Sequence, residues 1–170
     1  VNRKFRMDGE CPISFLLSNA GHFSENLQVL LSDPSIDLDY INPHTEEHLA
    51  LYAVRAGQFY LFLRIFKASS NLDRFRTFKF VCSSGASDEF FNFFLQLEDF
   101  EIFQKDILSM ETVLHVCAEE GRETRFSALL DHKSFRPEYL LQENWQGRNV
   151  LHIAIDNITD SSLLCRVLAY

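Results

Sequence analysis

The sequence is poor in the residues that mark tight turns, with six Gly and four Pro among 170 residues. This scarcity argues against a loop-rich, all-β fold. No apolar run reaches about 18 residues, so the sequence predicts no membrane-spanning helix. The polar and basic start, residues 1–10, does not have the character of a signal peptide. The chain also lacks the glycine-rich motifs that cradle phosphate groups, so we expect no nucleotide site.

The four cysteines lie far apart and form no C-x-x-C pair. They are Cys11, Cys82, Cys117 and Cys165. Buried free thiols in a reducing compartment fit this spacing better than a disulfide framework does. Together with the missing span and leader, the cysteines predict a cytoplasmic protein, with the nucleus as the second compartment to consider.

Positive charge is in short supply. The chain has 16 Lys and Arg against 24 Asp and Glu, which gives a net charge of −8. Binding to the phosphates of nucleic acid needs a basic surface, so we expect no nucleic-acid partner. An acidic surface suits ordinary solubility or a partner with a basic segment.

Apolar residues are abundant, at 46% of the chain, and they recur in units. The stretch TVLHVCAEEG (112–121) aligns with NVLHIAIDNI (149–158), which pairs Leu114 with Leu151 and the two following His residues with each other. Three weaker matches share this spacing: 11–21, 47–57 and 76–85, with Ile13, Leu49 and Phe78 at the Leu position. The units therefore recur about every 29 to 37 residues.

A second apolar segment follows each of these stretches. Several of these segments show the three- and four-residue spacing of an amphipathic helix. Each unit is thus expected to form two short antiparallel helices, and polar stretches of about ten to sixteen residues link one unit to the next.

This pattern resembles the ankyrin repeat, whose signature is T-P-L-H-x-A followed by Gly and a second helix. The match is best at Thr112, Leu114, His115 and Gly121, whereas units one to three lack the His. The resemblance implies an all-α solenoid of about five helix-turn-helix units with hairpin-like loops between them. After an N-terminal extension at 1–10, the units are expected at 11–44, 45–73, 74–109, 110–146 and 147–170.

Several residue types have structural explanations in such a stack. Close packing of the first helices favours small side chains, and the positions concerned are Ala53, Val81, Cys82, Cys117, Ala118 and Ala154. A left-handed helix end favours Gly, and the positions concerned are Gly21, Gly57, Gly85 and Gly121. Thr112 is expected to cap the helix that follows it. By resemblance, His115 and His152 are expected to hydrogen-bond the backbone near the helix start and the adjoining turn.

Two motifs invite a chemical interpretation. His115 and Cys117 are two residues apart on one helix and so point away from each other, which argues against a catalytic pair. The stretch NPHTEEH (42–48) contains His44, Glu46, Glu47 and His48, which can bind metal, but a solvated polar loop between two repeats is the preferred explanation. We therefore expect no enzymatic activity, no metal and no cofactor.

Two groups of aromatic residues leave alternatives open. The segment DEFFNFFLQLEDFEIFQ (88–104) carries Phe90, Phe91, Phe93, Phe94, Phe100 and Phe103. It either fills gaps in the core or exposes an aromatic patch for a partner, with Phe93 and Phe100 turned away from the core. The only Trp, Trp145, is expected at a loop tip, where it either anchors a partner or packs against the neighbouring loop.

By resemblance, a protein partner binds the concave side of an ankyrin stack, formed by loop tips and exposed positions of the first helices. The helix positions are Arg55, Ser83, Ser84, Glu119, Glu120, Asp156 and Asn157. The loop-tip positions are His44, Glu46, Asp73, Glu111, Trp145, Gln146 and Arg148. The expected function is thus protein–protein interaction. The identity of the partner is left open, since a fold alone does not name it.

Two versions of this function follow. An acidic stack of five irregular repeats is similar to the IκB-like inhibitors, which cover basic nuclear-targeting segments of Rel-type transcription factors. The alternative is a structural or assembly segment of a larger scaffold, receptor or channel. The last segment, LLCRVLAY, has no polar cap, which predicts self-association through Leu164 and Val167.

Overall fold

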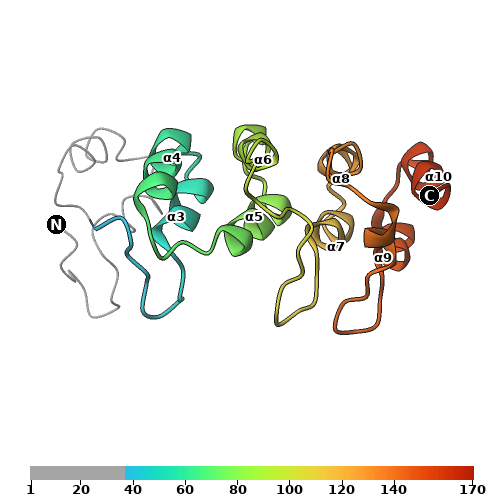
Figure 1. Cartoon of the computed structure of the whole chain (residues 1–170), viewed down its shortest axis with the longest axis horizontal. Helices are drawn as coiled ribbons and strands as arrows, with labels where there is room; N and C mark the ends of the chain where they lie inside the picture. The colour runs from blue at the N-terminus through green and yellow to red at the C-terminus, as the bar shows by residue number, and fades with distance from the viewer. Residues whose placement is uncertain (1–36) are drawn as a thin grey trace. The chain divides into compact units, whose positions relative to one another are not determined.

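A computed structural model describes residues 37–170 of the chain (Figure 1). Over this range the chain folds into eight α-helices and one short 3-10 helix, with two isolated β-bridges and no strand. The all-α fold class is therefore confirmed for this part of the chain. The predicted extension at 1–10, most of the first predicted unit (11–44), Cys11 and Gly21 lie outside the described residues.

The helices are short. They are α3 Leu49–Arg55, α4 Phe59–Ala68, α5 Arg74–Ser83, α6 Asp88–Leu95, α7 Val113–Glu119, α8 Glu123–Leu130, η1 Pro137–Leu141, α9 Val150–Asn157 and α10 Ser161–Leu168. The α-helices have seven to ten residues, and helices of this length are marginal alone in water. Packing of their apolar faces must therefore stabilise them. Between residues 37 and 170, no helix is long and apolar enough to cross a lipid bilayer.

The chain divides into two compact units, and the division falls within α5, between Thr77 and Phe78. In the first unit, α3 packs against α4 and is buried from Leu49 to Val54. The amphipathic α4 buries Phe62 and Ile65 and leaves Tyr60 exposed. These buried side chains form a core between the two helices in the described part of the unit.

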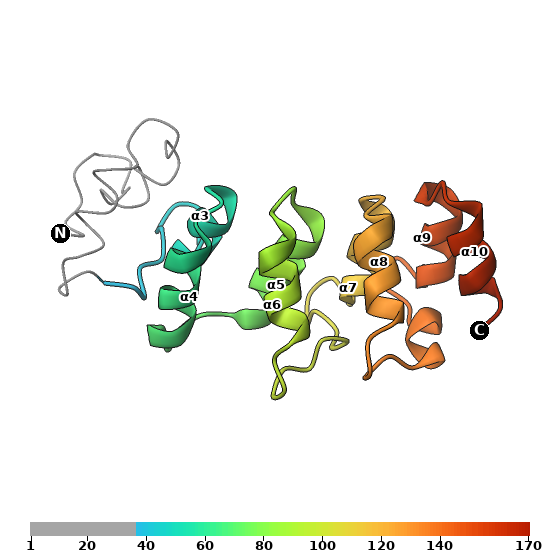
Figure 2. The ribbon, with the colours of Figure 1, turned by 90° about the horizontal axis from the view of Figure 1, so that it is seen from above.

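In the second unit, α7 and α9 lie side by side, and α8 and α10 cover them on one side (Figures 1 and 2). Cys117 and Ala118 on α7 and Ala154 on α9 have no exposed surface. Side chains this small allow α7 and α9 to approach closely. For α7 and α9 this agrees with the prediction that small residues let neighbouring first helices pack closely. The remaining small residues, Ala53, Val81 and Cys82, are also fully buried.

The Phe-rich segment packs inward. Phe90, Phe91 and Phe94 are buried on α6, as expected. The ring of Phe94 lies 4.8 Å from that of Phe78, and Phe100 packs against both rings. Aromatic pairs at such distances stabilise a core. Of the two interpretations of this segment, the structure supports core filling.

The prediction for the glycines is correct at two positions and wrong at a third. Gly57 and Gly121 have φ angles of 65° and 60°, in the left-handed region that favours Gly. Gly85 has no positive φ. There the carbonyls at the end of α5 accept hydrogen bonds from the guanidinium groups of Arg122, just before α8, and of Arg125 on α8, so no left-handed turn is needed to satisfy them.

The predicted self-association surface also needs correction. Val167 is only 2% exposed, because it packs inside the second unit on α10. Leu164 is half-buried, and Leu168 is exposed. Val167 is therefore a core residue, and self-association through Leu164 stays a prediction.

Candidate functional site

Three loops with the same hydrogen bonds precede α3, α7 and α9. We call them the first (42–47), second (106–111) and third (144–148) finger loops. Each begins with an Asn or Asp whose main-chain N–H donates to the carbonyl of the loop's last residue. The distances are 2.9 Å from Asn42 to Glu47, 2.8 Å from Asp106 to Glu111 and 2.9 Å from Asn144 to Arg148. The ends of each loop are therefore clamped together.

The tips of the finger loops are equally alike. The carbonyl of each first residue accepts the N–H of a residue with positive φ, namely Glu46 (54°), Met110 (56°) or Gly147 (72°). The Oδ1 atom of each first residue also accepts main-chain N–H groups at the tip. Side-chain hydrogen bonds of this kind are a known reason why Asn and Asp favour turns.

The residue after each finger loop caps the following helix. These residues are His48, Thr112 and Asn149. The sequence alignment placed Leu49 at the position of Leu114, and this is wrong by one residue, because α3 begins at Leu49 whereas α7 begins one residue before Leu114. Alignment on the capping residues also removes the extra residue before Gly57. Thr112 is the cap of α7, as predicted.

The two His residues of the Leu-His pairs bind the backbone, as the resemblance implied. Nδ1 of His115 accepts the Thr112 N–H at 3.1 Å, and Nε2 donates to the Gln142 carbonyl at 2.9 Å. His152 accepts the Asn149 N–H at 3.2 Å. Burial lowers the pKa of His115 and keeps the ring neutral. Because both of its nitrogens are occupied, His115 is not free to act as a base for Cys117.

Of the predicted binding residues in the first unit, His44 and Glu46 lie exposed on the first finger loop. Arg55 is also exposed, and it forms an ion pair with Glu47 at 2.6 Å. Asp73 does not lie at a loop tip. Its carboxylate accepts the Arg76 N–H at 2.8 Å at the start of α5, where it satisfies a free amide.

In the second unit, Trp145 and Gln146 are exposed on the third finger loop. Trp145 is 67% exposed, so its ring is available to a partner. Ser83 and Ser84 are half-buried, and Arg122 and Arg125 occupy their carbonyl oxygens. These two serines are therefore poor candidates for binding.

The remaining predicted residues surround the helices that follow the second and third finger loops. Glu111 is half-buried and pairs with Lys79 at 3.0 Å. Arg148 pairs with Asp156, which lies eight residues later on α9, and Asn157 is exposed beside it. Glu119 and Glu120 are exposed at the end of α7.

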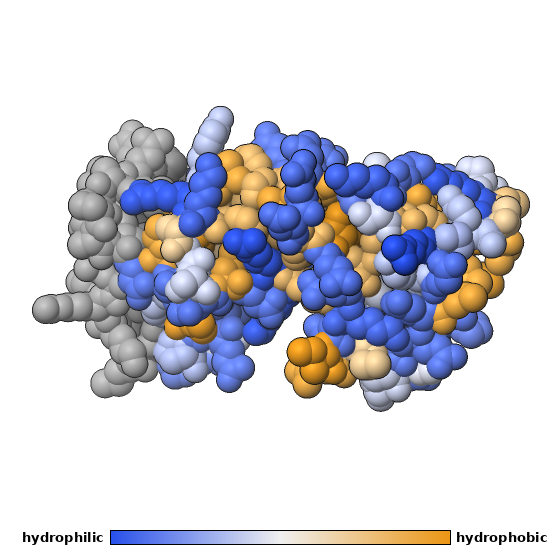
Figure 3. All heavy atoms as spheres, viewed as in Figure 1, coloured by the Kyte–Doolittle hydropathy of each residue, from blue (hydrophilic) through white to orange (hydrophobic). Residues whose placement is uncertain are grey.

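The most exposed apolar side chains of the second unit lie on the second finger loop. Ile107 and Leu108 are 91% and 90% exposed, and Met110 is 43% exposed. Figure 3 shows hydrophobic atoms gathered at the tip of the loop before α7. Our sequence interpretation missed these residues. The signal was three apolar residues in the segment DILSME, within a link that was expected to be polar.

The first unit brings a Ser, a His and an Asp together. The Ser69 hydroxyl is hydrogen-bonded to Asp39 and lies 3.1 Å from Nε2 of His48. Nδ1 of His48 accepts the Ala50 N–H, so Nε2 carries the proton and donates it to Ser69. The hydroxyl therefore donates to the carboxylate and not to the imidazole, which is the wrong direction for activating a nucleophile. The cluster joins the start of α3 to the end of α4.

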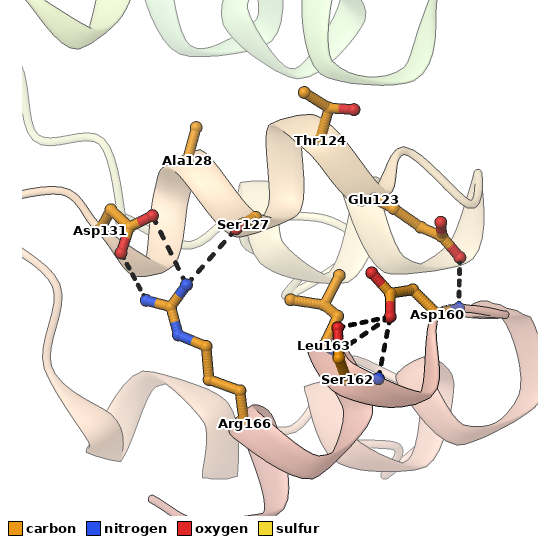
Figure 4. A pocket seen from close by; sticks show the side chains of 9 residues that line it. All are labelled: Glu123, Thr124, Ser127, Ala128, Asp131, Asp160, Ser162, Leu163 and Arg166. Atoms are coloured by element: carbon orange, nitrogen blue, oxygen red, sulfur yellow. Dashed lines mark hydrogen bonds and ion pairs between the residues drawn. The ribbon is translucent and has the colours of Figure 1, made fainter.

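A groove of about 510 Å³ lies between α8 and α10 in the second unit (Figure 4). Its charged side chains already have hydrogen-bond or ion-pair partners within the second unit. Glu123 accepts the Asp160 N–H at 2.9 Å, Asp160 caps α10 through the Ser162 N–H, and Asp131 pairs with Arg166 at 2.5 Å. The hydrogen bond from Asp160 lowers the pKa of Glu123. These interactions hold the two helices together, so the groove is part of the scaffold.

Residues 37–170 contain no group of three or more His, Cys, Asp or Glu side chains that could hold a metal ion. The strongest candidate for a binding surface is the pair of adjacent finger loops in the second unit, because they carry its most exposed apolar side chains.

A scan of protein-family models gives no match to the sequence, and a search of curated proteins gives none either.

Proposed function

We propose that this chain is a non-enzymatic protein-interaction module of the ankyrin-repeat type, with its helix pairs stacked as a solenoid. It binds a protein partner through its finger loops and the helices that follow them. The observation that carries this proposal is the threefold recurrence of one clamped loop followed by a capped helix. Recurring units that bury their apolar faces against neighbours are the design of repeat proteins.

The finger loops suit recognition better than chemistry. Their backbones are fixed by internal hydrogen bonds, so little conformational entropy is lost when a partner binds. Their tips carry exposed side chains, including Trp145 and Leu108. Exposed loops on a rigid scaffold are where proteins commonly place binding residues. The Ser69 cluster and the groove between α8 and α10 use their polar groups internally, which also favours binding over catalysis.

The test is affinity capture with a matched pair of baits. The wild-type chain and the variant Trp145→Ala/Glu119→Lys/Glu120→Lys capture proteins from an extract of cells that express the gene. We expect at least one protein to bind the wild type and not the variant. All three side chains are exposed, so the variant should keep its helix content, which circular dichroism checks.

The control variant carries Glu138→Lys/Leu141→Ala on η1, where both side chains are also exposed. This variant should retain the partner. If the finger-loop variant keeps every protein that the wild type binds, recognition by the finger loops is wrong, and the alternative of an assembly segment in a larger scaffold becomes the better explanation.

A further inference from the structure

We propose that the second and third finger loops bind a protein segment that combines exposed apolar side chains with Arg or Lys. The apolar side chains would contact Ile107, Leu108 and Trp145, and a basic side chain would pair with Glu119 of α7. This inference rests on the proposed function and names the chemistry of the partner.

The apolar half of the site is rigid. The main-chain N–H of Trp145 donates to the Ser109 carbonyl at 3.1 Å, and this hydrogen bond ties the tip of the third finger loop to the second finger loop. Lys105, just before the second loop, donates to the Glu143 carbonyl at 2.8 Å. Ile107 and Leu108 are therefore held in water on a fixed backbone. Exposed apolar side chains that gather in one place mark interaction sites, and Trp is common among residues that dominate binding.

The acidic half of the site follows from a comparison of the three finger loops. In the first, Glu47 pairs with Arg55, eight residues later. In the third, Arg148 pairs with Asp156, again eight residues later. The equivalent positions of the second loop are Glu111 and Glu119, which carry the same charge.

Glu111 binds Lys79 instead, and within residues 37–170 no cation pairs with Glu119. The two matching pairs show that this helix position is within reach of a side chain at the base of its finger loop. Glu119 therefore presents a carboxylate on the finger-loop side of α7, without an internal counter-ion.

The charge of the whole second unit has the same sign. Residues 78–170 contain eight Lys and Arg and fifteen Asp and Glu, a net charge of −7. Six of the eight cations bind groups of their own unit: Lys79, Lys105, Arg122, Arg125, Arg148 and Arg166. An incoming basic segment would thus be attracted, whereas a second copy of this unit would be repelled.

The test selects partners without assuming their sequence. A display library of random twelve-residue peptides is selected on the wild-type chain and depleted on the variant Ile107→Ser/Leu108→Ser. Both side chains are about 90% exposed, so the variant should fold normally. We expect the enriched peptides to carry at least one apolar residue close to Arg or Lys. Enrichment of peptides without basic residues, or of none at all, would overturn the proposal.

Trp145 supplies a second readout, because it is the only Trp of the chain. Binding of a synthetic copy of the most enriched peptide should shift the fluorescence emission of Trp145 to shorter wavelength, and high salt should abolish this shift. We expect Ile107→Ser/Leu108→Ser to weaken binding by about tenfold or more, and Glu119→Gln to weaken it by about threefold or more. The control variants Leu141→Ser and Glu138→Gln, both exposed on η1, should bind as the wild type does.

Two results would separate this inference from the proposed function. If a cellular partner binds the Ile107→Ser/Leu108→Ser variant as tightly as the wild type, the apolar contact is wrong while protein binding stands. If sedimentation shows a dimer of the wild type that this variant abolishes, a second copy occupies the site and the basic-segment proposal is wrong.

Discussion

The imidazole of His115 joins two consecutive parts of the second unit, because its Nε2 lies 2.9 Å from the carbonyl oxygen of Gln142. A carbonyl can only accept, so this nitrogen carries the proton and Nδ1 is left to accept the Thr112 N–H. One tautomer therefore caps the start of α7 and anchors the residue that follows η1.

Replacement of His115 by Ala should destabilise the chain by about 3 kcal/mol, because the buried Thr112 N–H and the half-buried Gln142 carbonyl lose their partner and a cavity forms. His152→Ala is the matched control. That side chain is exposed and binds only the start of α9, so we expect a loss of about 1 kcal/mol. Urea denaturation measures both. Equal losses would contradict the bridging role of His115.

Stability should depend on pH through the same residue. Burial lowers the pKa of His115, whereas the unfolded chain takes up a proton near the ordinary value of about 6.5. The stabilisation is therefore complete above about pH 6.5 and falls as the pH drops below that value. The unfolding free energy of the wild type should decrease between about pH 7.5 and pH 5.5. His115→Gln should show a shallower decrease with falling pH. An unchanged slope would argue against His115 as the source of the pH dependence. Burial also lowers the pKa of His48, but this residue is present in both the wild type and the variant and contributes equally to each.

Arg125→Met should destabilise the second unit by about 3 kcal/mol. The guanidinium is buried and donates to the carbonyls of Val81, Ser84 and Ala86. Met keeps the apolar stem but leaves these oxygens without that donor. Lys restores only one point of contact, so Arg125→Lys should recover a part of the loss.

Arg122→Met is the control for this experiment, because Arg122 is half-buried and donates only to the Ser83 carbonyl. We expect it to cost about 1 kcal/mol in urea denaturation. A cost equal to that of Arg125→Met would mean that burial of the guanidinium does not matter.

The shared finger-loop geometry predicts that two substitutions at equivalent loop positions change the stability in opposite directions. Gly147→Ala should destabilise by about 1 kcal/mol, since its φ of 72° strains any residue with a Cβ although the surrounding space is open. Glu46→Gly at the equivalent position, with φ 54°, should stabilise by about 0.5 kcal/mol. Gly85→Ala is the control. It has no positive φ and open space around it, so it should be neutral or slightly stabilising in thermal denaturation.

The local pattern of the sequence predicted much of the fold. Thr112 and the apolar spacing after it placed the start of α7 correctly, because capping and periodicity are properties of neighbouring residues. The ends were harder. Nothing near Gly85 in the sequence shows that Arg122 and Arg125, about 40 residues later, satisfy the carbonyls of α5.

The candidate site was predicted less completely. Trp145 and Gln146 were placed at a loop tip by the resemblance to ankyrin repeats, and they lie on the third finger loop. Asp73 was not at a tip, because the link between α4 and α5 is short and contains no finger loop. Ile107 and Leu108 were missed because apolar residues are normally assigned to the core, and only their exposure in the folded chain identifies them as surface groups.

The packing of α7 against α8 and α9, and of α9 against α10, bears on how the second unit is made. The helices of the pairs α7–α8 and α9–α10 are joined by short links, and α7 and α9 begin consecutive helix pairs, so these contacts need only short or moderate loops to close. During synthesis, each helix can meet its partner soon after both have left the ribosome. The helices of this unit can thus assemble from its N-terminal to its C-terminal end, in the order in which the ribosome synthesises them.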